Sequence, residues 1–167
     1  MFLRLCVVLV ALAAGACALR CSSKYEGKLQ VRIGNETHGV GADLNTGRPA
    51  KAVFSECRGK GVPSMMVGGV SFGKMQVDGK CVTQYADNGT LWLEPHECED
   101  DGDVLKTQLL QFTYQTGDAM IAGYSDGHYY PFVRLDGSRV VLESQSSHIS
   151  DQLQMKSPRR TGEKDSQ

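Results

Sequence analysis

The sequence predicts an all-β protein. Short segments that alternate apolar and polar side chains are interrupted by Gly, Asn or Asp every eight to twelve residues, which is typical of strands joined by turns. Helical periodicity is confined to residues 104–112, with Asp103 as the N-cap. Twelve strands or nearly so are expected. The clearest candidates are residues 28–33, 51–55, 69–75, 81–84, 91–94, 109–115, 119–122, 129–135 and 139–144.

Three passages share one arrangement, in which a strand enters a polar turn with glycine and a second strand follows. They are residues 41–47 with 51–57, 82–89 with 90–94, and 132–137 with 139–144. Their turn glycines, Gly47, Gly89 and Gly137, are 42 and 48 residues apart. Hairpins that recur at this period predict a β-trefoil, in which three four-stranded units together form a capped barrel. The alternative is a β-sandwich or jelly roll, since any all-β chain contains hairpins.

One domain preceded by a removable leader is the expected organisation. Residues 1–18 combine Arg4 with a short apolar run and end in Ala-Cys-Ala, which predicts a cleaved signal peptide and a secreted, extracellular protein. An uncleaved anchor is the alternative, but ten apolar residues are too few to span a bilayer. Residues 19–155 then form the single all-β domain. Residues 156–167 hold no large apolar side chain and predict a disordered tail.

The cysteines indicate disulfides rather than metal binding. Four would remain after cleavage: Cys21, Cys57, Cys81 and Cys98. An even set in an oxidising compartment predicts two disulfide bonds. Zinc is the alternative, but no two of the four have the short spacing that adjacent zinc ligands need, so no metal or cofactor is expected. Two sequons in polar turns, at Asn35 and Asn88, are candidate glycosylation sites.

A candidate ligand site lies in the most aromatic segment. Carbohydrate recognition needs a flat aromatic ring beside groups that bind hydroxyls. The candidate ligand-binding residues are Tyr124, Asp126, His128, Tyr129 and Tyr130. The alternative is that these tyrosines cap one end of the barrel. Tyr85 with Asp87 and Asn88 offers the same chemistry, and Trp92 faces away from its two leucine neighbours, toward either core or solvent.

Several function classes are disfavoured by composition and motifs. A net charge of −1 provides no excess of cations for nucleic acid. The four histidines are scattered, and neither Gly-x-Ser-x-Gly nor His-Glu-x-x-His is present, so no enzyme activity is expected. A small secreted hydrolase or ribonuclease is the third hypothesis, because catalytic residues can be distant in sequence. The acidic run over residues 94–103 lacks the calcium-loop register and is predicted to be a solvated loop.

The middle third of the chain opens with Cys81-Val82 and continues through the Asn88-Gly89 turn and a Leu-x-Leu strand to Cys98. A Gln-Phe pair follows at Gln111. This pattern resembles one repeat of the ricin B-type lectins. The Cys-Ser start of the predicted mature chain, with its Tyr-x-Gly-x-Leu, is also similar to small secreted proteins of basidiomycete fungi, among them the secreted skin antigens of Malassezia.

The lectin resemblance implies a β-trefoil and a bond between Cys81 and Cys98, which leaves Cys21 for Cys57. Ricin B-type lectins place a ligand Asp two residues after the first Cys, where this chain has Thr83. The third unit is therefore expected to carry any sugar site. The fungal similarity implies an allergen-like role at a host or cell-wall surface. We expect a monomeric lectin-like protein that binds glycan. The alternative is a module that binds an extracellular protein, such as a protease inhibitor.

Overall fold

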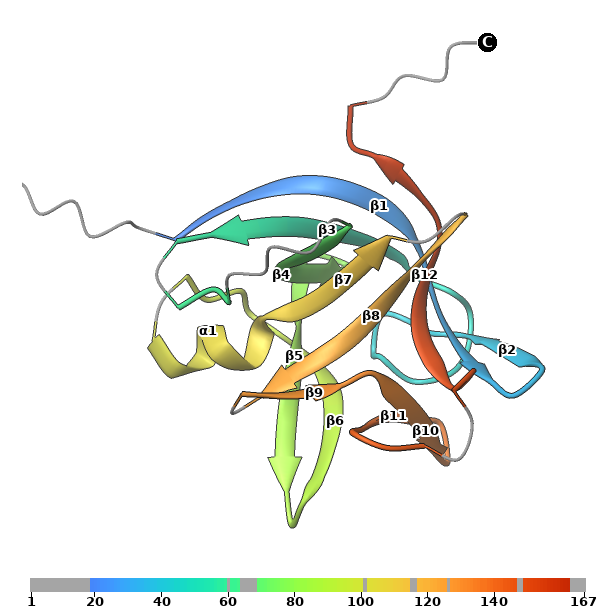
Figure 1. Ribbon diagram of the computed structural model, residues 1–167. Helices are drawn as coiled ribbons and strands as arrows, with labels where there is room; N and C mark the ends of the chain where they lie inside the picture. Colours follow the sequence, from blue (N-terminus) through green and yellow to red (C-terminus); the bar gives the residue numbers. More distant parts are fainter. Residues whose placement is uncertain are drawn as a thin grey trace, which may run out of the picture.

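The computed structural model describes residues 19–59, 61–63, 69–100, 102–114, 117–125, 127–146 and 149–162, without the side chains of 102–104. The predicted signal peptide lies outside these residues. Within them the chain forms twelve strands and one short helix (Figure 1). They are β1 (Arg20–Ile33), β2 (Glu36–Gly39), β3 (Lys51–Arg58), β4 (Val70–Val77), β5 (Lys80–Asp87), β6 (Thr90–His96), α1 (Gly102–Gln108), β7 (Leu110–Tyr114), β8 (Asp118–Ser125), β9 (His128–Tyr130), β10 (Phe132–Asp136), β11 (Arg139–Glu143) and β12 (Gln152–Arg160).

Six of the strands close into a ring of antiparallel neighbours. The pairs are β1–β3, β3–β4, β4–β7, β7–β8, β8–β12 and β12–β1. The all-β prediction is therefore confirmed. Every one of these strands has a hydrogen-bonded partner on each side, so the ring leaves few unpaired sheet edges.

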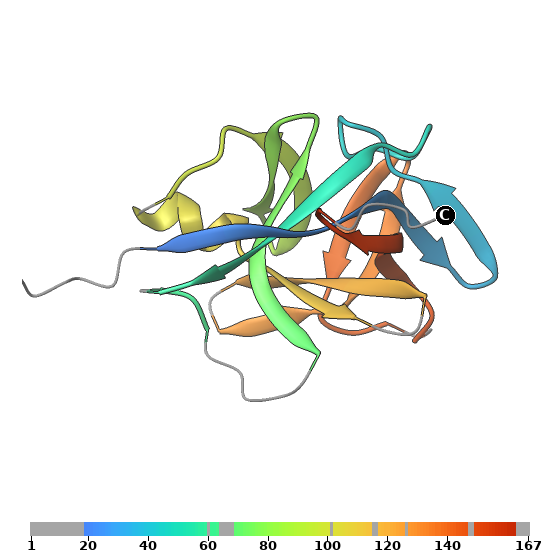
Figure 2. The ribbon, with the colours of Figure 1, turned by 90° about the horizontal axis from the view of Figure 1, so that it is seen from above.

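Two hairpins, β5–β6 and β10–β11, lie outside the ring and pair with each other through β6 and β11. In Figure 1 the hairpin β5–β6 projects downward from the ring. α1 and β2 lie at opposite ends of the molecule, as Figures 1 and 2 both show. Asn88 and Gly89 have φ angles of 48° and 78°, which fits a two-residue type I′ hairpin turn.

The first of the three predicted hairpins differs from its prediction. Residues 41–47 do not form a strand, because the chain turns at Gly41 to Leu44, where the Leu44 amide donates to the Gly41 carbonyl. Only one bridge, between Val40 and Thr46, closes this unit. Leu44 adopts a φ of 60° and its side chain is buried in the core. The residue with the turn conformation is therefore Leu44, whereas the sequence predicted a turn at Gly47.

The core fills the ring and the inward faces of the two hairpins. Its largest fully buried side chains include Phe54, Phe112, Leu29 and Met155. These residues alternate with less buried ones along their strands, since successive side chains of a strand point to opposite faces. Packing of the ring and the hairpins on a shared core explains why neither is expected to fold alone.

A column of stacked aromatic rings runs from the surface into this core. Tyr114, which is 47% exposed, stacks on Tyr25 with ring centroids 5.8 Å apart. Tyr25 stacks on Phe112 at 5.0 Å, and Phe112 stacks on Phe54 at 4.4 Å. The column joins β1, β3 and β7, so its central ring, Phe112, holds three of the ring strands together.

Both disulfides have the pairing that the lectin resemblance implied. Cys21 is bonded to Cys57 and joins β1 to β3, where the two residues are also register partners. Cys81 is bonded to Cys98 and joins β5 to the loop after β6. Two disulfides are consistent with an extracellular or secreted protein.

The C-terminal boundary of the domain was predicted too early. Residue 156 was expected to begin a disordered tail, but β12 continues to Arg160 and pairs with β1 as far as Tyr25. Backbone hydrogen bonds to β1 need no apolar side chain, so composition alone underestimated the order of this segment. Residues 163–167 lie outside the described part. The helix prediction was also displaced: α1 ends at Gln108, and residues 110–112 of the predicted helix belong to β7.

Candidate functional site

The outward side of the hairpin β5–β6 carries a cluster of exposed aromatic and charged side chains. Leu91 and Leu93 of β6 are buried, so Trp92 between them points away from the core, which resolves the alternative that the sequence left open. We call the resulting surface the hairpin face. It consists of Tyr85, Trp92, Glu94, His96 and Arg139.

Tyr85 and Trp92 form the aromatic centre of the hairpin face. They are directly opposite in the β5–β6 register, and their rings lie nearly parallel with centroids 6.3 Å apart. The Tyr85 hydroxyl is 3.0 Å from Nε2 of His96 and forms a hydrogen bond with it. Tyr85 is 37% exposed, so a ring surface held in place by two neighbours remains open to solvent.

Charged groups surround this aromatic pair. Trp92 Nε1 donates to Oε1 of Glu94 at 2.8 Å, which fixes the orientation of the carboxylate. The other oxygen, Oε2, lies 4.0 Å from His96 and accepts no hydrogen bond within the described part of the chain. The Arg139 guanidinium lies 5.2 Å from the Trp92 ring centre in a cation–π contact. The face thus combines a flat ring with an acceptor carboxylate and the donors of a guanidinium group.

Sequence reasoning missed three of these five residues. Glu94 was placed at the end of the predicted strand 91–94, but it was counted with the solvated acidic run and not considered as a site residue; it belongs to β6 and lies two residues from Trp92. The period of two along a strand places Glu94 and His96 beside Trp92, so this signal was present in the sequence. Arg139 had no such signal, because its place depends on the pairing of β11 with β6.

Four of the five predicted third-unit residues lie in the described part of the chain. Tyr124 and Tyr129 are in contact, with ring centroids 5.1 Å apart. Tyr130 packs against the core, as expected for its alternate position in β9, and His128 is exposed. Asp126 lies outside the described residues. Among the four predicted residues that the structure describes, a ring contact therefore joins Tyr124 with Tyr129.

Phe72 of β4 joins the Tyr124–Tyr129 pair. Its ring centre lies 5.6 Å from that of Tyr124 and 6.3 Å from that of Tyr129. Burial raises the pKa of Tyr129, and the nearby Tyr124 raises it further. The Tyr129 hydroxyl therefore stays protonated at neutral pH and can donate a hydrogen bond.

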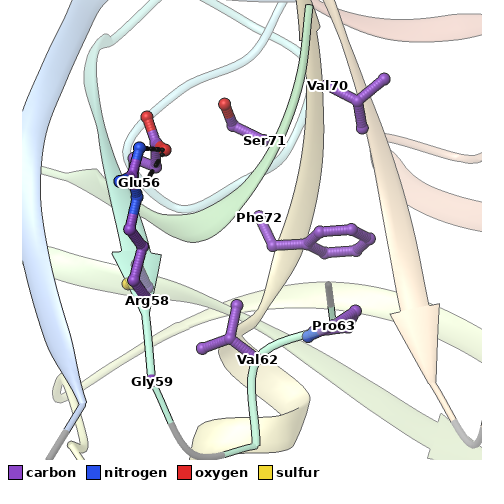
Figure 3. A pocket seen from close by; sticks show the side chains of 9 residues that line it. Glu56, Arg58, Gly59, Val62, Pro63, Val70, Ser71 and Phe72 are labelled. Carbon is purple, nitrogen blue, oxygen red and sulfur yellow. Dashed lines mark hydrogen bonds and ion pairs between the residues drawn. The ribbon is translucent and has the colours of Figure 1, made fainter. Parts of the chain in front are cut away.

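A pocket of about 520 Å³ is lined by Phe72 together with Glu56 and Arg58 (Figure 3). Glu56 and Arg58 of β3 form an ion pair on one wall, with Nη2 to Oε1 at 2.9 Å, while the Phe72 ring points away from them. Val62 lies between these two sides. The volume suits a small ligand, but the polar groups of one wall are already paired with each other.

Burial raises the pKa of Glu56, but hydrogen bonds from Lys24 and Arg58 outweigh it and hold the pKa below its ordinary value of 4.5. A lowered folded-state pKa adds stability that is present above the ordinary pKa and is lost as the pH falls through the lowered one.

We therefore expect Glu56→Gln to lower the thermal midpoint near neutral pH, and the difference from wild type to shrink as the pH is taken from about 5 to about 3. Glu36→Gln is the matched control, because the Glu36 side chain is 80% exposed. Thermal unfolding over this pH range measures both. If the difference in thermal midpoint between Glu56→Gln and wild type does not change with pH, the lowered pKa of Glu56 is contradicted.

A second pocket, of about 610 Å³, lies between α1, the hairpin β5–β6 and the end of β8. Gln84 on its wall is buried and makes four hydrogen bonds. Its Nε2 donates to the carbonyls of Thr107, Leu109 and Tyr124, and its Oε1 accepts from the Tyr124 amide. Because all of these groups bind one another, Gln84 positions Tyr124 and α1 rather than offering itself to a ligand.

Thr83, at the position of the lectin Asp, is 3% exposed. Its hydroxyl is bonded to the Cys81 carbonyl and to Nε2 of Gln108. Gln108 also donates to the Glu97 carbonyl and accepts from the Glu99 amide, so it ties the loop after β6 to α1. The buried Thr83 hydroxyl is therefore used in hydrogen bonds within the protein.

Both predicted glycosylation asparagines are exposed in hairpin turns. Asn35 lies between β1 and β2, and Asn88 lies at the tip of β5–β6. In the described ranges, no helix is long and apolar enough to cross a bilayer. Across the same residues, no three side chains of His, Cys, Asp and Glu gather as they would around a metal ion.

No protein-family model matches the chain, and no curated protein matches it.

Proposed function

We propose that this chain is a secreted, non-enzymatic, lectin-like protein of β-trefoil architecture that binds neutral glycan at the hairpin face. The trefoil assignment is supported by the six-stranded ring and by the hairpins β5–β6 and β10–β11. A third, shorter unit at Val40–Thr46 reaches the last hairpin through a bridge between Asn45 and Arg139. Three hairpin units beside a six-stranded ring are what a β-trefoil requires.

The exposed Tyr85 ring beside Trp92 is the observation that carries the proposed sugar binding. The apolar side of a sugar ring packs on a flat aromatic face, and the equatorial hydroxyls then need acceptors and donors at its rim. Glu94 supplies an acceptor oxygen and the guanidinium of Arg139 supplies donors, while Nε2 of His96 is bonded to the Tyr85 hydroxyl. Glu94 lies opposite Thr83 in the register, so a carboxylate is present beside the position where the lectins have their Asp.

An array of neutral oligosaccharides, probed with protein that begins at Leu19, tests this proposal. The protein should carry Asn88→Gln, so that a glycan attached to the hairpin tip cannot occupy the face. We expect binding to a restricted set of glycans. Tyr85→Ala should weaken that binding about two- to tenfold, because stacking contributes about 0.5–1.5 kcal/mol beyond buried area.

Tyr114→Ala is the matched control, since Tyr114 is a comparably exposed tyrosine far along the chain on β7. It should leave glycan binding unchanged. Tyr129→Ala tests the predicted third-unit site in the same titration. Loss of binding in Tyr129→Ala but not in Tyr85→Ala would move the site to the third unit. No glycan binding together with stoichiometric protease inhibition would replace the proposal with the protein-binding alternative.

The similarity of the mature N-terminus to small secreted fungal proteins supports an extracellular, allergen-like role. In that setting the protein would meet glycans of a host or cell-wall surface. The two disulfides agree with such a compartment.

A further inference from the structure

Three lysines stand in direct cross-strand register on neighbouring strands of the ring. Lys28 of β1 is paired with Lys51 of β3 on one side and with Lys156 of β12 on the other. We call these three residues the lysine row. Residues that are directly opposite on adjacent strands share a face, and strands are spaced at about 4.8 Å, so the row spans about 10 Å. All three side chains are exposed.

Like charges at directly opposite positions destabilise a sheet, so the lysine row lowers the stability of the fold. Two of its members have counter-charges: Lys51 Nζ lies 2.7 Å from Glu26, and Lys156 Nζ lies 2.9 Å from Asp118. Lys28, in the middle, has no ion pair within the described residues. The central ammonium group is therefore left to solvent or to a ligand.

A β-bulge adds a fourth cation to the same face. Glu26 pairs with Arg159 and Lys28 with Lys156, so one residue of β1 faces two of β12. Residues three apart on a regular strand point to opposite faces, but this bulge turns both Lys156 and Arg159 outward. Ser157 within it has a φ of 47°, a conformation that is strained for serine.

The row lines a pocket of about 510 Å³ whose lining includes four cations and one carboxylate. The lining residues are Glu26, Gly27, Lys28, Lys51, Lys156, Ser157 and Arg159. This local excess of positive charge contrasts with the chain's net charge of −1. It lies on β1, β3 and β12, whereas the hairpin face lies on β5, β6 and β11.

We propose that the lysine row is a binding site for an anionic polysaccharide, in which sulfate or carboxylate groups bind the ammonium groups across the strands. Among its described lining residues the pocket has no aromatic side chain on which a nucleobase could stack, which disfavours single-stranded nucleic acid. The same described residues include no apolar side chain that could insert into a bilayer, which disfavours a lipid surface. Clustered charge without either feature matches a hydrophilic polyanion.

Dextran sulfate and unsulfated dextran of the same length are the probes. We expect wild-type protein to bind dextran sulfate but not dextran, with affinity that falls as salt is raised from about 50 to about 200 mM. Lys28→Gln should weaken this binding about fivefold, the effect of one cation near an anionic surface. The triple variant Lys28→Gln, Lys51→Gln, Lys156→Gln should weaken it at least about tenfold.

Lys106→Gln is the matched control, because this exposed lysine lies on α1, which contributes no residue to the row. It removes one positive charge as Lys28→Gln does, and binding should change less than about twofold. The thermal midpoint of the triple variant should change little, since relief of like-charge repulsion offsets the loss of the two exposed ion pairs of Lys51 and Lys156. This separates loss of a ligand contact from loss of fold.

Equal binding of dextran sulfate by wild type and the triple variant would overturn the proposal, as would no binding by wild type at 50 mM salt. Tighter binding of a single-stranded oligonucleotide, or of phosphatidylserine vesicles, than of dextran sulfate would also overturn it. The Tyr85→Ala variant should bind dextran sulfate as wild type does. The lysine-row proposal therefore does not depend on glycan binding at the hairpin face.

Discussion

Phe112→Ala is expected to lower the free energy of unfolding by about 3–5 kcal/mol, the usual cost of deleting a buried aromatic side chain. Phe112 is 1% exposed and stacks on both Tyr25 and Phe54, so its removal opens a cavity where three ring strands meet. Urea unfolding monitored by circular dichroism measures the change.

Tyr114→Ala, at the exposed end of the same aromatic column, is the matched control. Tyr114 stacks only on Tyr25 and is 47% exposed, so its loss should cost no more than about 1.5 kcal/mol. Equal destabilisation by the two variants would show that the column does not organise the core as described.

Removal of the Cys21–Cys57 disulfide is expected to cost about 4 kcal/mol. The bond closes a loop with a sequence separation of 36 residues, and chain-entropy arguments relate the stabilisation to the logarithm of loop length. The variant is Cys21→Ser with Cys57→Ala, because Cys57 is buried against Leu105 and Leu109. Removal of the Cys81–Cys98 bond, with a separation of 17, should cost about 3 kcal/mol.

Equilibrium unfolding of the two double variants, each with the other disulfide intact, measures how much free energy of unfolding each bond contributes. Wild-type protein in reducing agent should lose more stability than either variant alone. A loss below about 1 kcal/mol for the Cys21–Cys57 variant would contradict a structural role for this bond.

Local sequence patterns were enough to predict strands and hairpins where the turn chemistry was unambiguous. The Asn88-Gly89 turn and the alternation of Leu91, Trp92 and Leu93 determine β5–β6 within a few residues. The first unit was harder, because Leu44 holds its turn at a positive φ that only burial of its side chain explains. Strand order in the ring depends on contacts distant in sequence, which no local pattern encodes.

In the proposed sites too, local contacts could be predicted from the sequence and contacts between distant strands could not. Tyr85 and Trp92 are cross-strand partners within one hairpin, so their association could be anticipated from sequence. Arg139 joins them only through the pairing of β11 with β6. The lysine row combines strands from both ends of the chain, and the bulge at Ser157 lies where composition predicted no structure at all.

Trp92 is the only tryptophan in the sequence, so intrinsic fluorescence reports directly on the hairpin face. The measurement that tests the central proposal is a fluorescence titration of the Asn88→Gln protein with neutral oligosaccharides selected on the array. We predict a saturable change in Trp92 emission, weakened about two- to tenfold by Tyr85→Ala and unaffected by Tyr114→Ala. Glycan binding detected by calorimetry without any change in Trp92 emission, or no binding at millimolar sugar, would contradict it.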